Sequence, residues 1–314
     1  MKRIIYYDNC WFTNVGEAFI DIGSLQLLKK IFPNEAIACV SNMTNFYYNE
    51  ITENRSNPLF NYEENSHIVS DYFFCYDCDY IVLSGMFACS SYLKAEGAGR
   101  RIVDYYVKRG AKVIFLGLGG ALYSKEEVNE FSEYLKDIKP ELVMTRDLIT
   151  YENYKNCCKC IPGIDCAFWI KESFNPKGFQ KKEYDIFAFN RSNEPQDLDN
   201  NNIQIVRPWH MQYYLKEEKC KKGLMVSDSP YDYLTLYANA RMVYTDLVHA
   251  TIISLMYGTP VKYWYIDKRS SAFDAINGLV HQNGWLSVSS ADLNKQKKEI
   301  EEEIKRHFFE IKNE

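Results

Sequence analysis

His249 follows a predicted strand and opens a predicted helix, a position at which an imidazole can do acid/base chemistry. Residues 242–244 form a short apolar run, and the next two residues, Thr245 and Asp246, are types that cap helix N-termini. Apolar residues then recur at helical spacing until Gly258, which ends the helix. His249 therefore lies in the first helical turn, beyond the carboxyl end of a strand, where ligands bind in open α/β sheets. A titratable ring beside unpaired backbone N–H groups predicts an anion-binding or acid/base site.

Polar residues and glycines also follow most of the other predicted strands. In the first half of the chain they are Asn14, Gly16, Glu17, Ser84, Gly85, Arg146 and Asp165, and in the second half Asn190, Arg191, Asp246, His249 and Lys268. Each has an ordinary structural explanation, because an arginine at a strand end often forms a surface ion pair and a glycine often only makes a turn. Their joint occurrence at so many separate strand ends favours one shared site.

Each half of the chain shows its own series of alternating predicted strands and helices. These elements must hold the polar residues in place. In the first half we expect strands at 3–7, 37–40, 79–85, 112–117 and 142–147, and helices at 18–31, 92–109, 125–137 and from 148 onward. In the second half we expect strands at 185–189, 203–206, 242–244 and 262–266, and helices at 231–237 and before Gly258, and residues 224–226 form a further apolar run. Residues 41–66 are polar and rich in asparagine, which predicts a long loop.

The two alternations predict an α/β protein with two doubly wound, Rossmann-like domains that face a cleft. Residues 171–182 are polar and contain a proline and a glycine, so they are the expected linker. The predicted domains are residues 1–175 and 183–290. A charged C-terminal helix follows over residues 291–314, with apolar side chains at helical spacing that must pack against another element.

Composition and charge are those of a globular protein that does not bind nucleic acid. The chain has 314 residues, of which 46% are hydrophobic and 25% charged, and its net charge is −5. No basic block or nucleic-acid motif occurs, which argues against a nucleic-acid partner. The sequence shows neither a signal peptide nor an apolar run long enough to span a bilayer, so we expect a cytoplasmic protein. The charged C-terminal helix is compatible with a membrane-peripheral site, and the oligomeric state stays open.

The ten cysteines allow two interpretations. Cys75 and Cys78, together with Cys157, Cys158 and Cys160, offer enough sulfur for a zinc site. Two of these cysteines are adjacent, however, and no histidine accompanies them at metal-binding spacing. We therefore expect free thiols, as is usual in the cytoplasm, and no metal.

Several short motifs, in this order, resemble those of the polysaccharide pyruvyl transferase family. Asn14-Val-Gly-Glu17 resembles its opening Asn-x-Gly-Asp motif, residues 79–85 its second strand and glycine turn, and residues 113–120 its glycine-rich strand end. Thr145-Arg-Asp147 resembles its Arg-Asp element, and Ile161-Pro-Gly-Ile-Asp165 its Pro-x-x-Asp element. The segment around His249 resembles its Arg-Leu-His-like helix start, which is followed by Gly-x-Pro and a strand. The resemblance covers roughly residues 3–270.

The resemblance implies a GT-B-like fold and a transferase. Members of the family move pyruvate from phosphoenolpyruvate onto two hydroxyls of a sugar, which forms a cyclic ketal during surface-polysaccharide synthesis. Phosphoenolpyruvate is then a co-substrate, and no cofactor is implied. The acceptor is a saccharide linked to a nucleotide or a lipid.

The same resemblance assigns roles to the candidate residues. It implies that His249 and Asp246 are catalytic and that Arg146, Arg191, Lys268 and Thr245 bind the donor, since phosphate and carboxylate groups require arginine or lysine in fixed geometry. It places Asn14, Gly16, Glu17, Ser84, Gly85 and Asp165 in the cleft on the acceptor side. The first domain is the expected acceptor side and the second the donor side. Trp209 and Tyr263 are aromatic candidates for stacking on a sugar, with a place in the core as the alternative.

Two positions depart from the family pattern. Glu17 replaces an aspartate, which is a mild change. Leu247 stands two residues before His249, where the family has an arginine, and leucine cannot bind an anion. Arg241, Lys262 and Lys268 are the candidate replacements for the lost guanidinium. The alternatives are a glycosyltransferase that uses a nucleotide sugar, and a non-catalytic relative that binds saccharide.

Overall fold

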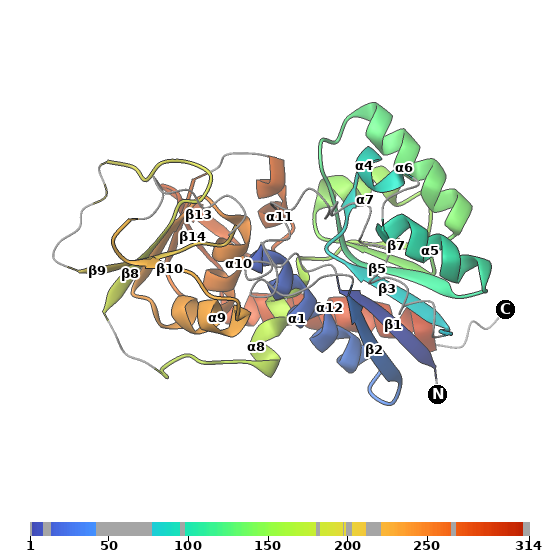
Figure 1. The fold of residues 1–314 in the computed structure, drawn as a ribbon, viewed down its shortest axis with the longest axis horizontal. Coiled ribbons are helices and arrows are strands. Elements are labelled where there is room, and N and C mark those ends of the chain that lie inside the picture. Colours follow the sequence, from blue (N-terminus) through green and yellow to red (C-terminus); the bar gives the residue numbers. More distant parts are fainter. Residues whose placement is uncertain are drawn as a thin grey trace, which may run out of the picture.

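Two β-sheets, one in each half of the chain, form the frame of the molecule (Figure 1). The computed structural model describes residues 2–8, 14–41, 77–94, 98–179, 183–196, 198, 203–211, 221–264 and 268–309. The predicted loop at 41–66 lies outside these residues beyond Ser41. Within the described ranges, no helix is both long and apolar enough to cross a bilayer.

The first half is a parallel sheet whose strands run in the order β2-β1-β3-β5-β6-β7, with β4 paired to β5. Its strands are β1 (Arg3–Asp8), β2 (Ala36–Ser41), β3 (Tyr80–Ser84), β4 (Phe87–Ala88), β5 (Lys112–Gly120), β6 (Leu142–Thr145) and β7 (Cys160–Ile161). Its helices are α1 (Val15–Ile31), α4 (Ser90–Leu93), α5 (Ala98–Lys108), α6 (Lys125–Ile138), α7 (Leu148–Tyr154) and α8 (Ile170–Ser173), the last preceded by a 3₁₀ turn at Cys166–Trp169. Strands β3, β5 and β6 are almost entirely buried, as parallel strands covered on both faces must be.

Successive side chains of these strands point to opposite faces and so build two apolar layers. Ile4, Tyr6 and Val82 pack with α1 on one face, whereas Ile5, Ile81 and the strand residues beside them pack with α5 and α6 on the other. Helix α1 begins at its N-cap Asn14, whose side-chain oxygen accepts a hydrogen bond from the Gly16 N–H at 3.1 Å.

The second half is a sheet in the order β10-β9-β8-β11-β12-β14-β13. Its strands are β8 (Tyr184–Ala188), β9 (Gln204–Pro208), β10 (Leu224–Met225), β11 (Met242–Thr245), β12 (Val261–Tyr263), β13 (Val280–Gln282) and β14 (Trp285–Ser287). Helices α9 (Pro230–Asn239) and α10 (Val248–Tyr257) pack on one face, and the short α11 (Ser271–Asp274) follows a 3₁₀ turn at Lys268–Ser270. Strands β8 to β12 pair in parallel, whereas the β13–β14 hairpin adds an antiparallel edge.

The C-terminal helix α12 (Ser290–Phe309) returns from the second half to the first, so both ends of the chain lie beside the first sheet (Figure 1). Its apolar side chains Ile300 and Ile304 are buried, and the Phe308 ring meets Phe32 with 5.0 Å between centroids. Glu301 accepts hydrogen bonds from Lys30 at 2.6 Å and from the Trp169 indole at 2.8 Å. The predicted apolar stripe therefore packs against the first half.

A continuous hydrophobic core joins the two halves. It runs from the first sheet through α1 and the 3₁₀ turn at Cys166–Trp169 to α10 and α9. A backbone hydrogen bond of 3.1 Å from the Val15 N–H to the His210 carbonyl adds a polar link between the halves. The start of α1 is thereby held against the end of β9, and this junction is one wall of the pocket described next.

The alternation predicted from sequence is confirmed, with differences at particular elements. The helix predicted over 92–109 is divided into α4 and α5, whereas the helices predicted around 125–137 and 291–311 are α6 and α12. The strand predicted at 262–266 is shorter, because β12 ends at Tyr263. Strand β4 and the β13–β14 hairpin were not expected. The domain boundaries at 175, 183 and 290 stay predictions.

Candidate active site

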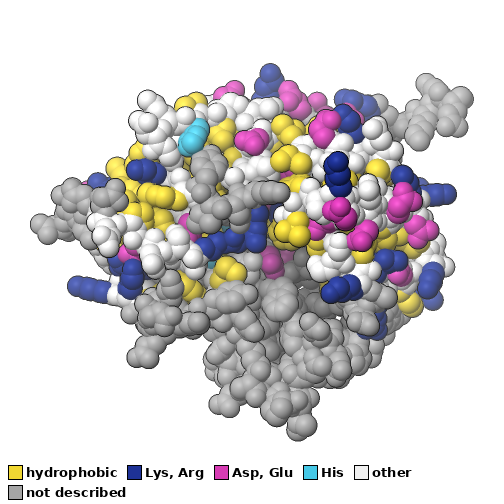
Figure 2. Space-filling view, turned by 90° about the horizontal axis from the view of Figure 1, so that it is seen from above, with side chains coloured by type: hydrophobic (Ala, Val, Ile, Leu, Met, Phe, Trp, Pro, Cys, Tyr) yellow, Lys and Arg dark blue, Asp and Glu magenta, His cyan; other side chains and the backbone are white. Residues whose placement is uncertain are grey.

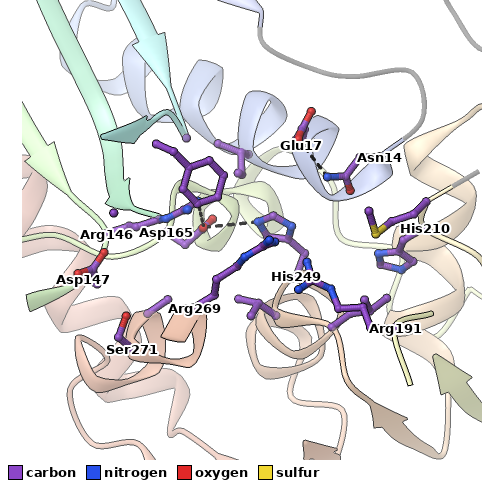
Figure 3. A pocket seen from close by; sticks show the side chains of 18 of the residues that line it. Asn14, Glu17, Arg146, Asp147, Asp165, Arg191, His210, His249, Arg269 and Ser271 are labelled. Atoms are coloured by element: carbon purple, nitrogen blue, oxygen red, sulfur yellow. Dashed lines mark hydrogen bonds and ion pairs between the residues drawn. The ribbon is translucent and has the colours of Figure 1, made fainter. Parts of the chain in front are cut away.

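The two sheets direct their carboxyl ends at one pocket between the halves (Figure 3). In the first sheet the chain starts at β1 and adds β2 on one side and β3 on the other. In the second sheet it starts at β8 and adds β9 and β11 in the same divergent way. Such a reversal opens a crevice at the strand ends, and here the two crevices face each other. The pocket encloses about 900 Å³ including its open mouth.

The pocket wall combines charged, polar and apolar groups from both halves. It is lined by Asn14, Glu17, Ile20, Gly85, Phe87, Gly120, Tyr123, Arg146, Asp147 and Asp165 from the first half, and by Arg191, His210, Met211, Leu247, Val248, His249, Arg269, Ser271 and Ala272 from the second.

His249, Asp165 and Arg146 form a charged group across the junction (Figure 3). The Asp165 Oδ2 atom lies 3.7 Å from His249 Nε2 and 3.8 Å from Arg146 Nη1. The other carboxylate oxygen, Oδ1, accepts a hydrogen bond of 2.9 Å from the Ala167 N–H. Asp165 is buried, whereas the His249 side chain keeps 20% of its surface exposed toward the pocket. The carboxylate thus orients an accessible imidazole without itself facing solvent.

The charge state of Asp165 follows from this arrangement. Burial by itself raises the pKa of the Asp165 carboxyl, but the adjacent His249 and Arg146 outweigh burial and hold that pKa below its ordinary value. Asp165 is therefore ionised at neutral pH.

Two glycines allow the side chains of this group to lie flat on the backbone. A Cβ atom at Gly16 would stand 2.2 Å from His249 Nδ1, and a Cβ atom at Gly119 would stand 2.3 Å from Arg146 Nε. No other residue fits at these positions without displacing the imidazole or the guanidinium. Gly16 and Gly119 therefore leave the space that the His249 and Arg146 side chains occupy in the site.

The N-terminus of α10 points at the pocket without a side-chain cap. Its N-cap residue is Leu247, which makes no capping hydrogen bond, and Val248 and His249 of the first turn line the pocket. Uncapped N–H groups and the positive end of the helix dipole attract anions. Three arginines, Arg146, Arg191 and Arg269, line the same pocket, and Figure 2 shows basic side chains gathered at the junction of the two halves. The carboxylates Glu17, Asp147 and Asp165 line the same pocket, so the arginines and the start of α10 offer a local site for an anionic group.

His210 is a second imidazole in the pocket wall, and it is neutral. Burial, together with the charge of His249, lowers the pKa of His210 to about 3. Its Nε2 atom lies 2.7 Å from the Tyr237 hydroxyl, and its ring meets Phe19 at 5.9 Å between centroids. His210 therefore packs as part of the junction, and His249 is the imidazole placed to exchange protons with a ligand.

The comparisons with known proteins agree with the motifs. The family model for polysaccharide pyruvyl transferase matches residues 14–261, a span that includes Asn14, Arg146, Asp165 and His249. The chain belongs to the polysaccharide pyruvyl transferase family. None of the curated proteins compared with it matches the sequence.

Solved structures similar to this chain have a GT-B-type fold. A putative UDP-N-acetylglucosamine 2-epimerase from Listeria monocytogenes aligns with a TM-score of 0.55 at 10% identity, covering 98% of this chain and 89% of that one. MnaA from S. aureus with UDP aligns at 0.54 and 12% identity, with 98% and 90% covered. UDP-GlcNAc 2-epimerase from Neisseria meningitidis bound to UDP-GlcNAc aligns at 0.52 and 12% identity, with 100% and 95% covered. At these identities the likeness concerns the fold alone.

Most of the site residues predicted from the sequence of this pyruvyl transferase family member line the pocket. Asn14, Glu17, Gly85, Arg146, Asp165, Arg191 and His249 line it, and Gly16 lies directly beneath the His249 ring. Asn190 supports it from behind, because its side-chain oxygen accepts a hydrogen bond of 2.7 Å from the His210 N–H. Ser84, Thr245 and Asp246 are not among the lining residues. The side chain of Lys268 lies outside the part of the chain that the structure describes.

Ser84 and Thr245 are buried and hold the backbone. The Ser84 hydroxyl donates to Asp21 at 3.1 Å and also contacts the Tyr6 hydroxyl, which itself donates to Asp21 at 2.6 Å. The Thr245 hydroxyl donates to the Ala188 carbonyl at 2.9 Å and accepts from the Leu247 N–H at 2.9 Å. These hydrogen bonds hold the ends of β3 and β11, and the two side chains do not line the pocket.

Asp246 holds the loop that follows β8. Its Oδ1 atom accepts from the Asn190 N–H at 3.2 Å, and Oδ2 accepts from the Arg191 and Ser192 N–H groups at 3.1 and 2.7 Å and from the Ser192 hydroxyl at 2.9 Å. The residue is 2% exposed. The predicted helix cap is wrong, since α10 begins at Val248 and these contacts engage both carboxylate oxygens of Asp246. The geometry indicates a positioning residue for Arg191.

We expect an Asp246→Ala substitution to lower the free energy of unfolding by about 1–3 kcal/mol, because it leaves several part-buried donors without an acceptor. Anion binding should weaken as well, since the loop carries Arg191. Urea unfolding and phosphate titration measure the two effects. An Asp185→Ala variant is the matched control, because buried Asp185 binds Arg241 at the opposite edge of the same sheet and should affect stability only. Wild-type stability with lost turnover in Asp246→Asn would instead indicate direct participation in the reaction.

Arg241 and Lys262, two of the candidate replacements for the arginine that the family has at position 247, do not line the pocket. Arg241 precedes β11 at the far edge of the sheet, where it binds Asp185 at 2.9 and 2.6 Å. Lys262 lies over the Trp264 ring, 5.2 Å from its centroid. Arg269 does line the pocket. Lys268 and not Arg269 was selected from the sequence, because sequence alone does not show which side chains line a pocket.

Two aromatic candidates for sugar stacking are core residues. Trp209 is 4% exposed and donates its indole N–H to the Met211 carbonyl at 2.7 Å, and Tyr263 is 3% exposed against Phe273. The aromatic residues that do line the pocket are Phe87 and Tyr123 from the first half. Both lie on segments after strand ends that the sequence pattern did not single out.

The described cysteines include no disulfide. Cys157, Cys158 and Cys160 lie together against the core of the first half, and burial raises the pKa of Cys158 and of Cys160 to about 12. The Cys158 and Cys160 thiols are protonated at neutral pH. Of the other two candidate zinc ligands, Cys78 is a half-buried free thiol, and Cys75 lies outside the described residues.

Proposed function

We propose that this protein transfers the pyruvyl group of phosphoenolpyruvate to a saccharide precursor of a surface polysaccharide, forming a cyclic ketal. Family membership supports an enzyme that modifies a polysaccharide. The observation that supports the donor is the uncapped N-terminus of α10 in a pocket that three arginines and His249 line. A small molecule with a phosphate and a carboxylate matches that set of groups.

In this proposal the second half binds the donor. The phosphate lies at the first turn of α10 within reach of Arg191, and Arg146 approaches the donor from the opposite wall. Thr245 and Asp246 act on the donor site indirectly, by fixing the end of β11 and the Arg191 loop. No cofactor takes part, and phosphoenolpyruvate is consumed as a co-substrate.

His249 is the proposed acid/base catalyst. One acceptor hydroxyl adds to C2 of the donor and passes its proton to a phosphate oxygen, while C3 receives a proton from the imidazolium. The product is a tetrahedral carbon that still bears the phosphate. The second hydroxyl then forms a bond to C2 as the C2–O bond to phosphate breaks, and its proton leaves to a base. The imidazole next to ionised Asp165 can supply the first proton and accept the last, so it is regenerated in each turnover.

The first half is the proposed acceptor side. Asn14, Glu17 and Gly85 line the pocket there, and Asn14 donates to Glu17 at 3.0 Å. A carboxylate paired with an amide is a common way to bind sugar hydroxyls, because both supply directed hydrogen-bonding groups. The acceptor is a nucleotide- or lipid-linked saccharide, and the proposed location is the cytoplasm.

The test is incubation with phosphoenolpyruvate and a panel of saccharide acceptors while released phosphate is measured. We expect acceptor-dependent phosphate release and a product that carries the mass of a pyruvyl ketal. No release with any acceptor, together with firm binding of a nucleotide sugar, contradicts the proposal and favours the glycosyltransferase alternative. Arg269 lessens the need for that alternative, because it returns a guanidinium to the pocket that Leu247 had removed.

A further inference from the structure

Tyr123 brings an aromatic ring to the pocket from a turn whose backbone suits an aromatic residue poorly. The turn joins β5 to α6, and Tyr123 has a φ of 56° there, in the left-handed region. Glycine and asparagine enter this region readily, whereas a bulky side chain in it is an outlier of the kind that gathers at functional sites. Tyr123 is half-buried and lines the pocket. A residue type that fits the backbone poorly and reaches the pocket points to a task for its side chain.

Buried Glu127 holds the turn in this conformation. Its Oε2 atom accepts hydrogen bonds from the N–H groups of Leu122 and Tyr123 at 2.9 and 3.0 Å. Glu127 is 4% exposed, and its own N–H donates to the hydroxyl of Ser124, the N-cap of α6, at 3.2 Å. Because a buried side chain and the start of a helix fix the turn, the Tyr123 ring is positioned before any ligand binds.

The Tyr123 ring lies against the end of β5 and reaches the second half with its hydroxyl. A Cβ atom at Gly120 would stand 2.3 Å from the Cε1 atom of the ring, so glycine leaves the room that the ring occupies. The Tyr123 hydroxyl lies 3.4 Å from the hydroxyl of Ser271, which opens α11 on the other side of the pocket (Figure 3). Burial raises the pKa of the Tyr123 hydroxyl, which therefore keeps its proton at neutral pH. The side chain is an uncharged ring with a polar tip at the boundary of the two halves.

The surroundings of Tyr123 suit a sugar better than those of Phe87, the other phenyl-type ring of the pocket wall. The guanidinium carbons of Arg146 and Arg269 lie 4.5 and 5.7 Å from the centroid of Phe87, so that ring has cations beside it. A pyranose presents C–H groups on its faces and hydroxyls at its edge, and it packs on an aromatic ring that has polar groups next to it. Tyr123 offers such a ring, and the carboxylate of Asp147 lines the same pocket.

We propose that Tyr123 is a specificity-determining residue for the acceptor, whose ring packs against the C–H face of the sugar that receives the pyruvyl group. The inference rests on the proposed function, because that function makes the ligand of the first half a saccharide. Asn14 and Glu17 of the same half line the pocket and supply hydrogen-bonding groups for the edge of the sugar. The contact selects a ligand with an apolar face, so a pyranoside binds and an acyclic polyol does not.

The experiment measures binding of methyl pyranosides of glucose, galactose, mannose and N-acetylglucosamine to the full chain by ligand-observed NMR titration, with sorbitol as the acyclic polyol. We expect Tyr123→Asn to weaken pyranoside binding about 10-fold, because the contact area of the ring is lost while asparagine keeps the left-handed backbone. Tyr123→Phe keeps the ring and should bind within about 3-fold of the wild type. Lys139→Asn is the matched control, since exposed Lys139 has a φ of 46° and does not line the pocket, and it should bind as the wild type does.

Gly120→Ala tests the same contact from the other side. Its Cβ atom displaces the Tyr123 ring, so saccharide binding should weaken, and this variant decides the question if melting temperatures show that Tyr123→Asn is unfolded. In steady-state kinetics, Tyr123→Asn should raise KM for the acceptor and leave KM for phosphoenolpyruvate unchanged. A purely structural role would instead lower the melting temperature and affect both substrates alike.

Three results overturn the inference: a wild-type protein that binds no pyranoside or binds sorbitol equally well, a folded Tyr123→Asn protein with wild-type affinity, and a Tyr123→Phe protein that loses as much affinity as Tyr123→Asn. Pyranoside binding that depends on Tyr123, without phosphate release from phosphoenolpyruvate, contradicts the proposed function instead and supports the role of Tyr123 in sugar binding.

Discussion

Replacing His249 with alanine is expected to lower turnover of phosphoenolpyruvate by about 10²- to 10⁴-fold, the usual contribution of a positioned acid/base group. The imidazole is the accessible titratable ring in the pocket, and buried Asp165 orients it at 3.7 Å. Donor affinity should change much less than turnover, because the arginines and the α10 N-terminus remain. The measurement is steady-state kinetics with separate values of kcat and KM.

Two controls make this result specific. His281→Ala removes an exposed histidine on β13 that is not among the residues lining the pocket, and should leave kcat unchanged. The melting temperature of His249→Ala shows whether the site stays folded. Full activity in a folded His249→Ala protein would assign the proton transfers to another group and remove the central residue of the proposed mechanism.

Replacing Asp165 with asparagine should have the second largest effect, on both activity and stability. The amide keeps the volume and the acceptor for the Ala167 N–H, but it loses the charge that faces His249 and Arg146. We expect turnover to fall by about 10²- to 10⁴-fold, as when a histidine loses its orienting carboxylate. Stability should fall by roughly 1–3 kcal/mol, since a nearly buried guanidinium then lacks its charged partner.

The pH dependence of Asp165→Asn provides an independent check. The folded pKa of Asp165 lies below its unfolded value of about 3.9, so the ionised carboxylate stabilises the fold above that pH. This stabilisation is lost as the pH falls through the lower, folded pKa. Urea unfolding of wild type and variant should therefore show a constant difference above about pH 5 that shrinks below about pH 4. A difference that grows on acidification would mean that the folded protein favours the protonated carboxyl.

Local sequence patterns predicted the elements well because each element carries its own signals. Helix α10 was expected before Gly258, and Gly258 ends it in the left-handed conformation with φ of 70°. The predicted strand at 242–244 corresponds to β11, since apolar β-prone residues precede a polar turn. Asp147 at the start of α7 accepts a hydrogen bond from the Thr150 N–H, as a residue of its type does before a helix.

Long-range arrangement was beyond such patterns. The spacing of apolar residues does not show that β3 pairs with β1, or that β14 pairs antiparallel to β12. These pairings depend on packing between distant segments. The direction of a side chain at a strand end is equally hidden, and for that reason Asp246 was expected in the site although it binds the loop at 190–192.

Sequence patterns also failed to show that Arg269 belongs to the pocket. Its neighbours in sequence gave no sign that it lines the pocket, because that depends on how the segment before α11 crosses between the halves. The sequence showed the glycines but not why a side chain is excluded at their positions. Gly16 and Gly119 are explained only by the His249 and Arg146 side chains that lie against them.

The most direct test of the donor site is a crystal structure of the protein with phosphoenolpyruvate bound. We predict that its phosphate lies at the N-terminus of α10, beside His249, with Arg191 and Arg146 contacting the donor from opposite halves. A donor bound elsewhere, or a pocket that accepts a nucleotide sugar and excludes phosphoenolpyruvate, would contradict the account.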